Sequence, residues 1–341
     1  MRIAILTPTF SQFSGIDRVV EQEANDFMEQ GNDVTIFCFK AEMKTNAKVI
    51  EIGMPKNQTL ERIYRLFFFV DLLKIKMIVD QLQYFDKVIC HQYPMTILGK
   101  VAKDKYSNIH YTYHDAGVAT PELFNSFVEK TYMRMFRFFT NKTINNTDNV
   151  ISISKYLSDV LYKETGLKST VEYVKINKER FNKDVIKGIV REKYKLGDAP
   201  IFLYVGRISP HKGIHLLIEA FNLVLQTMSD AKLLIVGKET FGDYAKQLKQ
   251  LASKVNKDSI IFTGFIPDDE LQYYYADANI YTTCSLWEGY NMPIAEAAAC
   301  GTPTIAFDIG AHPEVIEQGR LVEKGNIQKF SKAIMSYLRN E

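Results

Sequence analysis

Short apolar runs alternate with longer amphipathic segments along the whole chain. In the first half, the runs that we predict as buried strands are residues 3–6, 34–39, 88–90, 109–113 and 150–153. The rhythm restarts in the second half, where the predicted strands are residues 201–205, 232–236, 260–263, 280–283 and 304–307. Strands that alternate with helices in this way form parallel sheets covered by helices on both faces.

The two successive sets of strands predict an α/β protein with two doubly wound domains. A chain of 341 residues also exceeds the size of most single hydrophobic cores. The rhythm is interrupted between about residues 170 and 200, where the sequence is polar, charged and weakly periodic. We therefore expect an N-terminal Rossmann-like domain over 1–170, a C-terminal one over 171–341, and a hinge within about 170–200.

Composition narrows the functional classes. The hydrophobic fraction of 46% and the charged fraction of 24% are typical of a folded soluble protein. A net charge of +2 disfavours a dedicated nucleic-acid binder. The four cysteines are widely separated, which disfavours a zinc site or a disulfide framework. No stretch approaches the roughly 18 apolar residues that span a bilayer, so we expect a cytoplasmic protein.

The most informative segment is residues 285–303, in which a loop turns into an alanine-rich helix. Pro293 suits the first helical position, and the following helix points the backbone N–H groups of about 291–295 at one spot. Such a spot binds phosphate. Glu288 and Glu296 flank it, and carboxylates in that place accept hydrogen bonds from hydroxyl groups rather than contact the anion. The pattern therefore predicts a site for a nucleotide joined to a sugar.

A second cluster follows the strand at 201–205. Ligands of open parallel sheets bind beyond the carboxyl ends of the strands. There Gly206 permits a sharp turn, and Arg207 and Lys212 offer a guanidinium fork and an ammonium group. These two cations suit a diphosphate.

Together these patterns resemble the retaining GT-B glycosyltransferases of family 4. Their signature is matched by Gly206-Arg207 with Lys212-Gly213, by residues 264–267, and by an E-x7-E motif formed by Glu288 and Glu296. The similarity is strongest over residues 200–316. It implies two Rossmann-like domains that face each other across a cleft, with a nucleotide-sugar donor held mainly by the C-terminal domain.

The resemblance also implies roles for single residues of the C-terminal domain. Arg207 and Lys212 bind the donor diphosphate, Glu288 contacts the sugar hydroxyls, and Glu296 holds the ribose. No metal or other cofactor is expected, since two cations and a helix N-terminus supply the charge that a magnesium ion otherwise provides. The remaining donor-binding residues in this domain are expected to be Gly206, Gly289, Tyr290, Asn291, Met292 and Pro293.

In the N-terminal domain, the resemblance places His114 near the donor sugar, as a fourth catalytic residue. His91 and Asp115 are expected on the acceptor side, and Gly15 is expected to bring backbone N–H groups to the phosphates. Two departures from the family pattern are Ser14, where a glycine is usual, and residues 175–178, which lack the usual Asn-Gly turn.

The resemblance implies a front-side displacement, in which the leaving phosphate takes the proton of the acceptor hydroxyl. The expected acceptor is a glycan or a lipid-linked glycan. Residues 62–84 and 127–139 mix aromatic and basic side chains at helical spacing. Such faces lie on anionic lipid surfaces in some proteins and form buried stripes in others. Contact with the inner face of a membrane therefore stays open.

Three other classes of protein are alternatives to a glycosyltransferase. A dehydrogenase needs a G-x-G-x-x-G turn after a strand, which residues 7–15 lack. An exported sugar-binding protein has no use for a diphosphate clamp beside E-x7-E, whereas a non-catalytic GT-B relative that binds a nucleotide sugar stays open as an alternative. A GT-B epimerase or phosphorylase is the nearest enzymatic alternative. The sequence leaves the nucleotide base, the donor sugar and the acceptor open.

Overall fold

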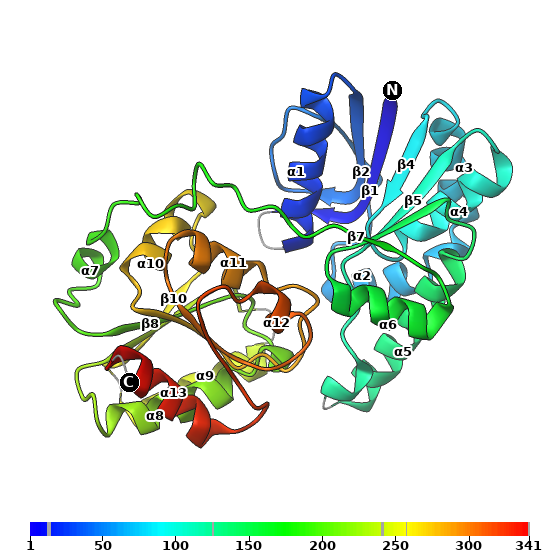
Figure 1. Cartoon of the computed structure of the whole chain (residues 1–341). Coiled ribbons are helices and arrows are strands. Elements are labelled where there is room, and N and C mark those ends of the chain that lie inside the picture. The colour runs from blue at the N-terminus through cyan, green and yellow to red at the C-terminus, as the bar shows by residue number, and fades with distance from the viewer. Residues whose placement is uncertain (12–14, 125, 240–241, 257, 340–341) are drawn as a thin grey trace. The chain divides into compact units, whose positions relative to one another are not determined.

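A computed structural model describes residues 1–11, 15–124, 126–239, 242–256 and 258–339. The chain divides into two compact units, Met1–Val174 and Lys175–Glu341, each built around one parallel sheet with helices (Figure 1). The expected α/β class is confirmed.

The N-terminal unit holds a seven-stranded sheet in the order β3-β2-β1-β4-β5-β6-β7. All its paired neighbours are parallel in the described part of the chain, as in the pairing of Ile5 with Ile36 and Ile89. Its strands are β1 (Arg2–Phe10), β2 (Asp33–Ala41), β3 (Lys48–Glu51), β4 (Lys87–Cys90), β5 (His110–Asp115), β6 (Asn149–Ser152) and β7 (Thr170–Val171). Its helices are α1 (Gly15–Glu29), α2 (Gln58–Leu66), η1 (Phe68–Val70), α3 (Leu72–Leu82), α4 (Met95–Lys105), η2 (Pro121–Leu123), α5 (Phe127–Thr143) and α6 (Lys155–Thr165).

The C-terminal unit holds a six-stranded parallel sheet in the order β10-β9-β8-β11-β12-β13. Its strands are β8 (Ile201–Val205), β9 (Lys232–Val236), β10 (Ile260–Gly264), β11 (Ile280–Thr283), β12 (Thr304–Phe307) and β13 (Gly319–Val322). Its helices are α7 (Ile189–Lys193), η3 (Pro210–Lys212), α8 (Ile214–Leu225), α9 (Gly242–Val255), η4 (Asp268–Glu270), α10 (Leu271–Asp277), α11 (Met292–Ala299), α12 (His312–Val315) and α13 (Ile327–Leu338).

Each of the ten predicted strands is confirmed. Nine of them lie inside the sheets, and the tenth, β10, is an edge strand that still carries an apolar run. The three strands that the pattern missed are β3, β7 and β13, which form sheet edges and are partly exposed. These three strands lack the apolar run by which the others were found. The helical segment 62–84 is also interrupted, since the Asp71 carboxylate accepts a hydrogen bond from the backbone N–H of Lys74 and caps α3.

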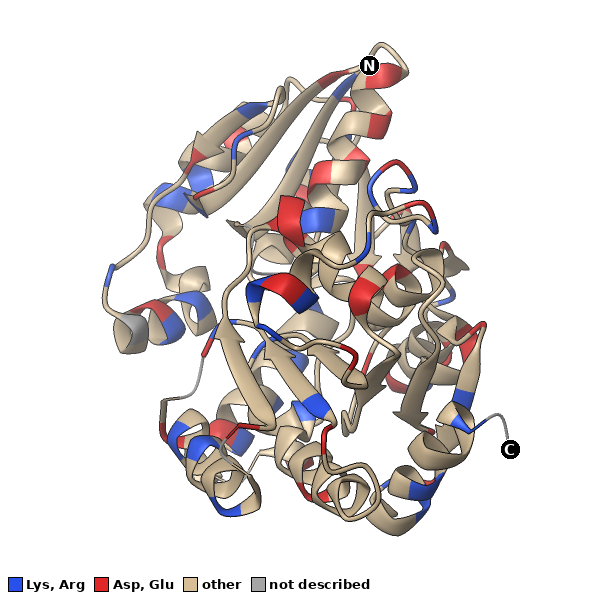
Figure 2. Cartoon of the chain, turned by 90° about the vertical axis from the view of Figure 1, so that its left-hand side faces the viewer, with Lys and Arg blue, Asp and Glu red and all other residues tan. Residues whose placement is uncertain are grey.

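No helix among the described residues is long and apolar enough to cross a membrane. On the face drawn in Figure 2, basic and acidic residues are interspersed along the helices and loops of the described chain. Charge on this face therefore does not mark a functional site, and the candidate residues are those at the carboxyl ends of the strands.

Candidate functional site

Two glycines bring three loops of the C-terminal unit together at the carboxyl ends of β8, β11 and β12. Gly213 ends η3 with φ +61°, and a Cβ there would lie 2.0 Å from the carbonyl oxygen of Cys284. Gly310, which follows β12, has φ +50°, and a Cβ there would lie 2.2 Å from the carbonyl oxygen of Glu288. Only glycine permits these approaches. The loops that carry Lys212 and Glu288 are thus held against each other by backbone packing.

The centre of this arrangement is an ion pair between Lys212 and Glu288. The ammonium Nζ of Lys212 donates to Oε1 of Glu288 at 2.6 Å, and their side chains are 17% and 8% exposed. Burial by itself raises the pKa of Glu288, but the Lys212 ammonium, His312 and hydrogen bonds lower it below its ordinary value. The carboxylate is therefore ionised at neutral pH.

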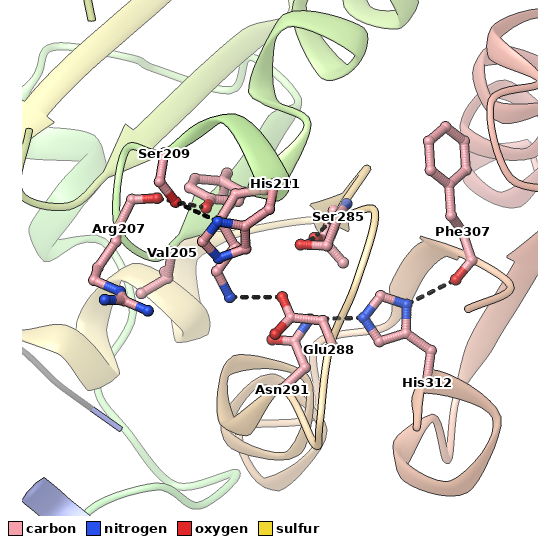
Figure 3. A network of polar contacts seen from close by, with 12 residues as sticks. Val205, Arg207, Ser209, His211, Ser285, Glu288, Asn291, Phe307 and His312 are labelled. Atoms are coloured by element: carbon pink, nitrogen blue, oxygen red, sulfur yellow. Dashed lines mark hydrogen bonds and ion pairs between the residues drawn. The ribbon is translucent and has the colours of Figure 1, made fainter. Parts of the chain in front are cut away.

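His312 and Asn291 support one side of this pair. The ring nitrogen Nδ1 of His312 lies 2.7 Å from the carbonyl oxygen of Phe307, and Nε2 lies 2.8 Å from Nδ2 of Asn291 (Figure 3). Burial lowers the pKa of His312. The neutral ring therefore donates through Nδ1 to the carbonyl and accepts at Nε2 from the Asn291 amide. This bond holds Asn291 in its left-handed conformation, with φ +78°.

A second neutral imidazole and a free cation complete the surroundings of the pair. Figure 3 shows the Glu288 carboxylate with His211 on one side and His312 on the other. Burial, assisted by the nearby Lys212 ammonium, lowers the pKa of His211 to about 3. Arg207 is exposed, and its guanidinium pairs with no carboxylate among the residues that the structure describes. The site therefore has one cation already neutralised and one that is available.

The helix behind the site begins one residue earlier than the sequence predicted. α11 starts at Met292, so that Pro293 is the second helical residue. Proline has no N–H group, and the N–H of Ile294 donates to the carbonyl of Asn291 at 3.0 Å. Ala295 is the fourth residue of the helix, so its N–H belongs to the intrahelical ladder. Three of the five N–H groups expected at this spot are thus not available, and the phosphate site predicted from the helix N-terminus alone is correspondingly weaker. Gly289 and Tyr290 lie in the loop before it.

Glu296, the second acid of the motif, is 1% exposed and points inward from α11. The hydroxyl of Tyr275, itself fully buried, donates to Oε2 of Glu296 at 2.6 Å. Glu288 and Glu296 thus have different partners, an ammonium and a phenol. The sequence analysis missed Tyr275, whose apolar surroundings on α10 gave no signal of a polar role.

The N-terminal unit holds a polar cluster that we call the Glu23 cluster (Glu23, His91 and His114). Nε2 of His91 lies 2.7 Å from Oε2 of Glu23, Nδ1 of His114 lies 3.7 Å from Oε1, and the two ring centroids are 4.6 Å apart. The three residues present potential metal-ligand atoms within 4.8 Å of one another. The sequence analysis found both histidines at strand ends and missed Glu23, which lies inside a helix.

Asp115 and Gly15 complete the predicted residues of this unit. The Asp115 carboxylate accepts hydrogen bonds from the N–H of Gly117 at 3.0 Å and from the hydroxyls of Tyr113 and Ser152 at 3.2 and 3.4 Å. These bonds fix the carboxylate of Asp115 at the end of β5, and its expected place on the acceptor side stays a prediction. Gly15 is the first residue of α1, and Ser14 lies outside the described residues.

Comparison with known proteins covers both units. Residues 13–174 match the family model described as Glycosyltransferase Family 4, and residues 187–341 match the model described as Glycosyl transferases group 1. Together the two matches span nearly the whole chain.

Two relatives in sequence and one solved structure illustrate the proteins to which this chain is similar. O-antigen chain mannosyltransferase B of Escherichia coli is 30% identical over 45% of this chain and 40% of its own length. The GDP-mannose-dependent alpha-(1-6)-phosphatidylinositol monomannoside mannosyltransferase of Mycolicibacterium smegmatis is 30% identical over 52% of this chain and 48% of its own. The matched segment thus spans less than half of each relative. The structure of Alr3699/HepE of Anabaena in complex with UDP and glucose superposes with a TM-score of 0.79 at 19% identity, over 100% of this chain and 90% of that one.

Proposed function

This chain belongs to glycosyltransferase family 4 and has the GT-B fold, and from that premise we propose that it transfers a sugar from a nucleotide-diphosphate sugar to an acceptor hydroxyl. The acceptor is a glycan or a lipid-linked glycan, and the transfer retains the anomeric configuration. Two relatives carry the word mannosyltransferase in their names, and a structure of the same fold was obtained with UDP and glucose. These names support the class of donor, either UDP- or GDP-linked.

The observation that carries the proposal is the buried contact between Lys212 and Glu288. An ammonium group is a ligand for a diphosphate, and a carboxylate is a ligand for sugar hydroxyls. Binding of the donor would exchange the partners of both groups, so that Lys212 moves from the carboxylate to the phosphate and Glu288 accepts from hydroxyls. A buried pair that is replaced by two other buried contacts keeps both charges compensated throughout.

The chemical step depends on the two cations of the site, Arg207 and Lys212. Arg207, which is unpaired among the described residues, and Lys212 would stabilise the negative charge that develops on the leaving diphosphate. The bond from the anomeric carbon to the phosphate oxygen breaks while the bond to the acceptor oxygen forms on the same face. The departing phosphate oxygen takes the acceptor's proton. Orientation and electrostatic stabilisation supply the catalysis, without a metal ion and with Glu296 on the ribose.

A donor screen tests this function. The purified protein is mixed, in the presence of EDTA, with UDP-glucose, UDP-GlcNAc, UDP-galactose or GDP-mannose, and thermal stabilisation and slow hydrolysis are measured. A donor at 100 times its Kd should stabilise the folded state by about 2.7 kcal/mol. Arg207→Ala and Glu296→Gln should lose this response. No response to any donor contradicts the proposal, and epimerised sugar without transfer favours the epimerase alternative.

Membrane contact on the acceptor side is supported by an apolar surface of the N-terminal unit. α2 packs against α5, and the rings of Phe69 and Phe139 are 5.1 Å apart, so these segments are neighbours. The buried face of α3 consists of Ile75, Ile78, Val79 and Leu82. Leu73 lies outside this face and is 84% exposed. The exposed apolar side chains of these segments are those of Leu60, Ile63, Val70, Leu72, Leu73, Met77, Phe127, Val128 and Phe138.

The charge of the same segments favours an anionic lipid bilayer as the partner. Residues 58–82 and 127–143 together hold eight Lys or Arg and four Asp or Glu. Apolar side chains flanked by such an excess of cations bind anionic membrane surfaces. We expect vesicles of phosphatidylglycerol to sediment the protein and vesicles of phosphatidylcholine to do so weakly. Leu73→Asp should release it without changing donor hydrolysis, whereas Ile186→Asp, at an exposed position of the other unit, should not.

A further inference from the structure

Helix α1 carries a carboxylate at a position that its pattern reserves for an apolar side chain. Ile16, Val20 and Phe27 contribute to the core between this helix and the sheet. Glu23 stands seven residues after Ile16 and three after Val20, on the same stripe. Its side chain is only 15% exposed. A charge at such a position costs free energy unless it is compensated by specific partners.

The other acid on this face, Asp17, shows what a structural role looks like. Its carboxylate accepts hydrogen bonds from the backbone N–H and the hydroxyl of Ser11, both at 2.8 Å, and from the hydroxyl of Thr9. Asp17 thereby ties the loop after β1 to the helix. Within the described chain, the partners of Glu23 are two imidazoles, His91 and His114, each at the carboxyl end of a strand.

The distances within the Glu23 cluster indicate which ring nitrogen of His91 carries the proton. At 2.7 Å, the His91 Nε2–H donates to the carboxylate. The 3.7 Å from His114 Nδ1 to Glu23 is too long for a hydrogen bond. Nδ1 of His91 and Nδ1 of His114 are both buried without a hydrogen-bond partner in the described part of the chain. Buried ring nitrogens left unpaired are costly and mark a site rather than a core.

The short contact favours a hydrogen bond over a shared metal ion. Ligand atoms bound to one metal at 2.0–2.2 Å stand about 3.0–3.5 Å apart. The Glu23 and His91 atoms are closer than that, at 2.7 Å.

We propose that Glu23 is a positioning residue, which fixes the ring orientation and tautomer of His91 and, through the contact between the rings, the place of His114. The contact between the rings is 4.6 Å between centroids, with the planes 41° apart. This assignment rests on the proposed function, in which His114 lies near the donor sugar. Glu23 acts on the transfer only through the two imidazoles.

The first arm of the test is spectroscopic and needs no donor. Long-range ¹⁵N–¹H spectra of the full chain report which nitrogen of each histidine carries the proton. The wild type should show His91 protonated at Nε2, and Glu23→Gln and Glu23→Leu should shift the signals of both rings. Glu29→Gln, at an exposed position of the same helix, should leave them unchanged. Unchanged ring signals in both Glu23 variants would overturn the proposal.

The second arm separates positioning from folding. Leucine suits the apolar stripe of α1 but leaves the buried Nε2–H of His91 without its acceptor, so Glu23→Leu should melt somewhat lower than the wild type, and its kinetics are measured at a temperature at which circular dichroism shows it fully folded. Its kcat should nevertheless fall about 10- to 100-fold, with the KM for the donor within about threefold. A kcat equal to that of the wild type would refute the role in transfer. Stoichiometric uptake of Zn²⁺ by the wild type, lost in Glu23→Gln, would overturn it in favour of a metal site. Shifted ring signals without transfer from any donor would leave the Glu23 assignment standing and remove the proposed function.

Discussion

In the C-terminal unit the buried carboxylate of Glu288 contacts an ammonium group, whereas in the N-terminal unit that of Glu23 contacts two imidazoles. A lysine keeps its charge throughout the physiological pH range, while the charge of a histidine changes near neutrality. Burial lowers the pKa of His91, which favours the neutral ring. The C-terminal unit thus offers a permanent cation, suited to a phosphate. The N-terminal unit offers the neutral, oriented ring of His91, suited to hydroxyl groups.

The largest expected effect is on Lys212. We expect Lys212→Ala to lower kcat about 10²- to 10³-fold, because the leaving diphosphate loses a cation in the transition state. Donor affinity should fall by less than tenfold. The measurement is transfer or donor-hydrolysis kinetics beside calorimetric binding of the donor.

A loss of stability has to be separated from this loss of turnover. Lys212→Ala leaves Glu288 buried without its partner, at a cost of about 3 kcal/mol. The double variant Lys212→Met/Glu288→Gln should regain the stability without the turnover, and Lys254→Ala serves as a control. Equal losses of kcat and affinity would count against a role in the transition state.

Gly310→Ala should displace the backbone of the loop that carries Glu288. The added Cβ would meet the Glu288 carbonyl oxygen at 2.2 Å, in a left-handed conformation. We expect a loss of about 2–4 kcal/mol of unfolding free energy together with a loss of donor binding. Gly325→Ala has comparable backbone strain, with φ +81° and no atom within 4 Å, and should cost only about 1–2 kcal/mol. Similar unfolding curves for the two variants would contradict the packing account.

Tyr275→Phe tests the second acid of the motif. The variant removes the hydroxyl that donates to Glu296 at 2.6 Å, which should cost about 1–3 kcal/mol of stability and weaken nucleotide binding. Chemical denaturation and calorimetry measure the two effects. Tyr162→Phe, at an exposed position of the other unit, should change neither. Unaltered nucleotide affinity in Tyr275→Phe would contradict the proposed contact between Glu296 and the ribose.

One buried group in each unit, Asp17 and His211, should contribute to the acid response of stability with opposite signs. Burial raises the pKa of Asp17 from 3.8 to about 6, so the folded state binds more protons than the unfolded state between these values, and its stability rises as pH falls. The pKa of His211 is lowered from 6.5 to about 3, so the unfolded state binds more protons there, and stability falls as pH falls.

Differences between variant and wild type isolate these two slopes. Between pH 6 and 4.5, Asp17→Asn should lose stability relative to the wild type as pH falls, and His211→Phe should gain it. The slope for one proton is at most about 1.4 kcal/mol per pH unit. Parallel pH profiles for both variants would show that neither group keeps the protonation described.

The sequence predicted the fold well because its inner strands are continuous apolar runs. It missed the edge strands β3, β7 and β13, which have at most two apolar residues in a row, whereas the edge strand β10 has three and was found. It placed the start of α11 one residue late, at Pro293, because the preference of proline for the first turn does not distinguish the first position from the second.

The candidate site was predicted less completely. Arg207, Lys212, Glu288 and Glu296 follow strands or lie in a spaced motif, so their chain positions and the resemblance to the family together predict them as site residues. The partners that hold them come from elsewhere in the fold. Tyr275 and His312 reach Glu296 and Asn291 only through tertiary packing. In the sequence, Glu23 does not differ from the other polar residues of an amphipathic helix. Its burial against His91 depends on how this helix packs on the sheet.

The exchange of partners between Lys212 and Glu288 is the central claim, and Glu288→Gln tests it most directly. Calorimetry would compare the affinity of the free nucleoside diphosphate with that of the nucleotide sugar chosen by the donor screen. Replacing the carboxylate by an amide frees the ammonium for phosphate and leaves the sugar hydroxyls with a weaker, uncharged acceptor. The account predicts that the variant binds the nucleoside diphosphate several-fold more tightly and the nucleotide sugar more weakly than the wild type. Affinities that fall together, or that do not change, would contradict it.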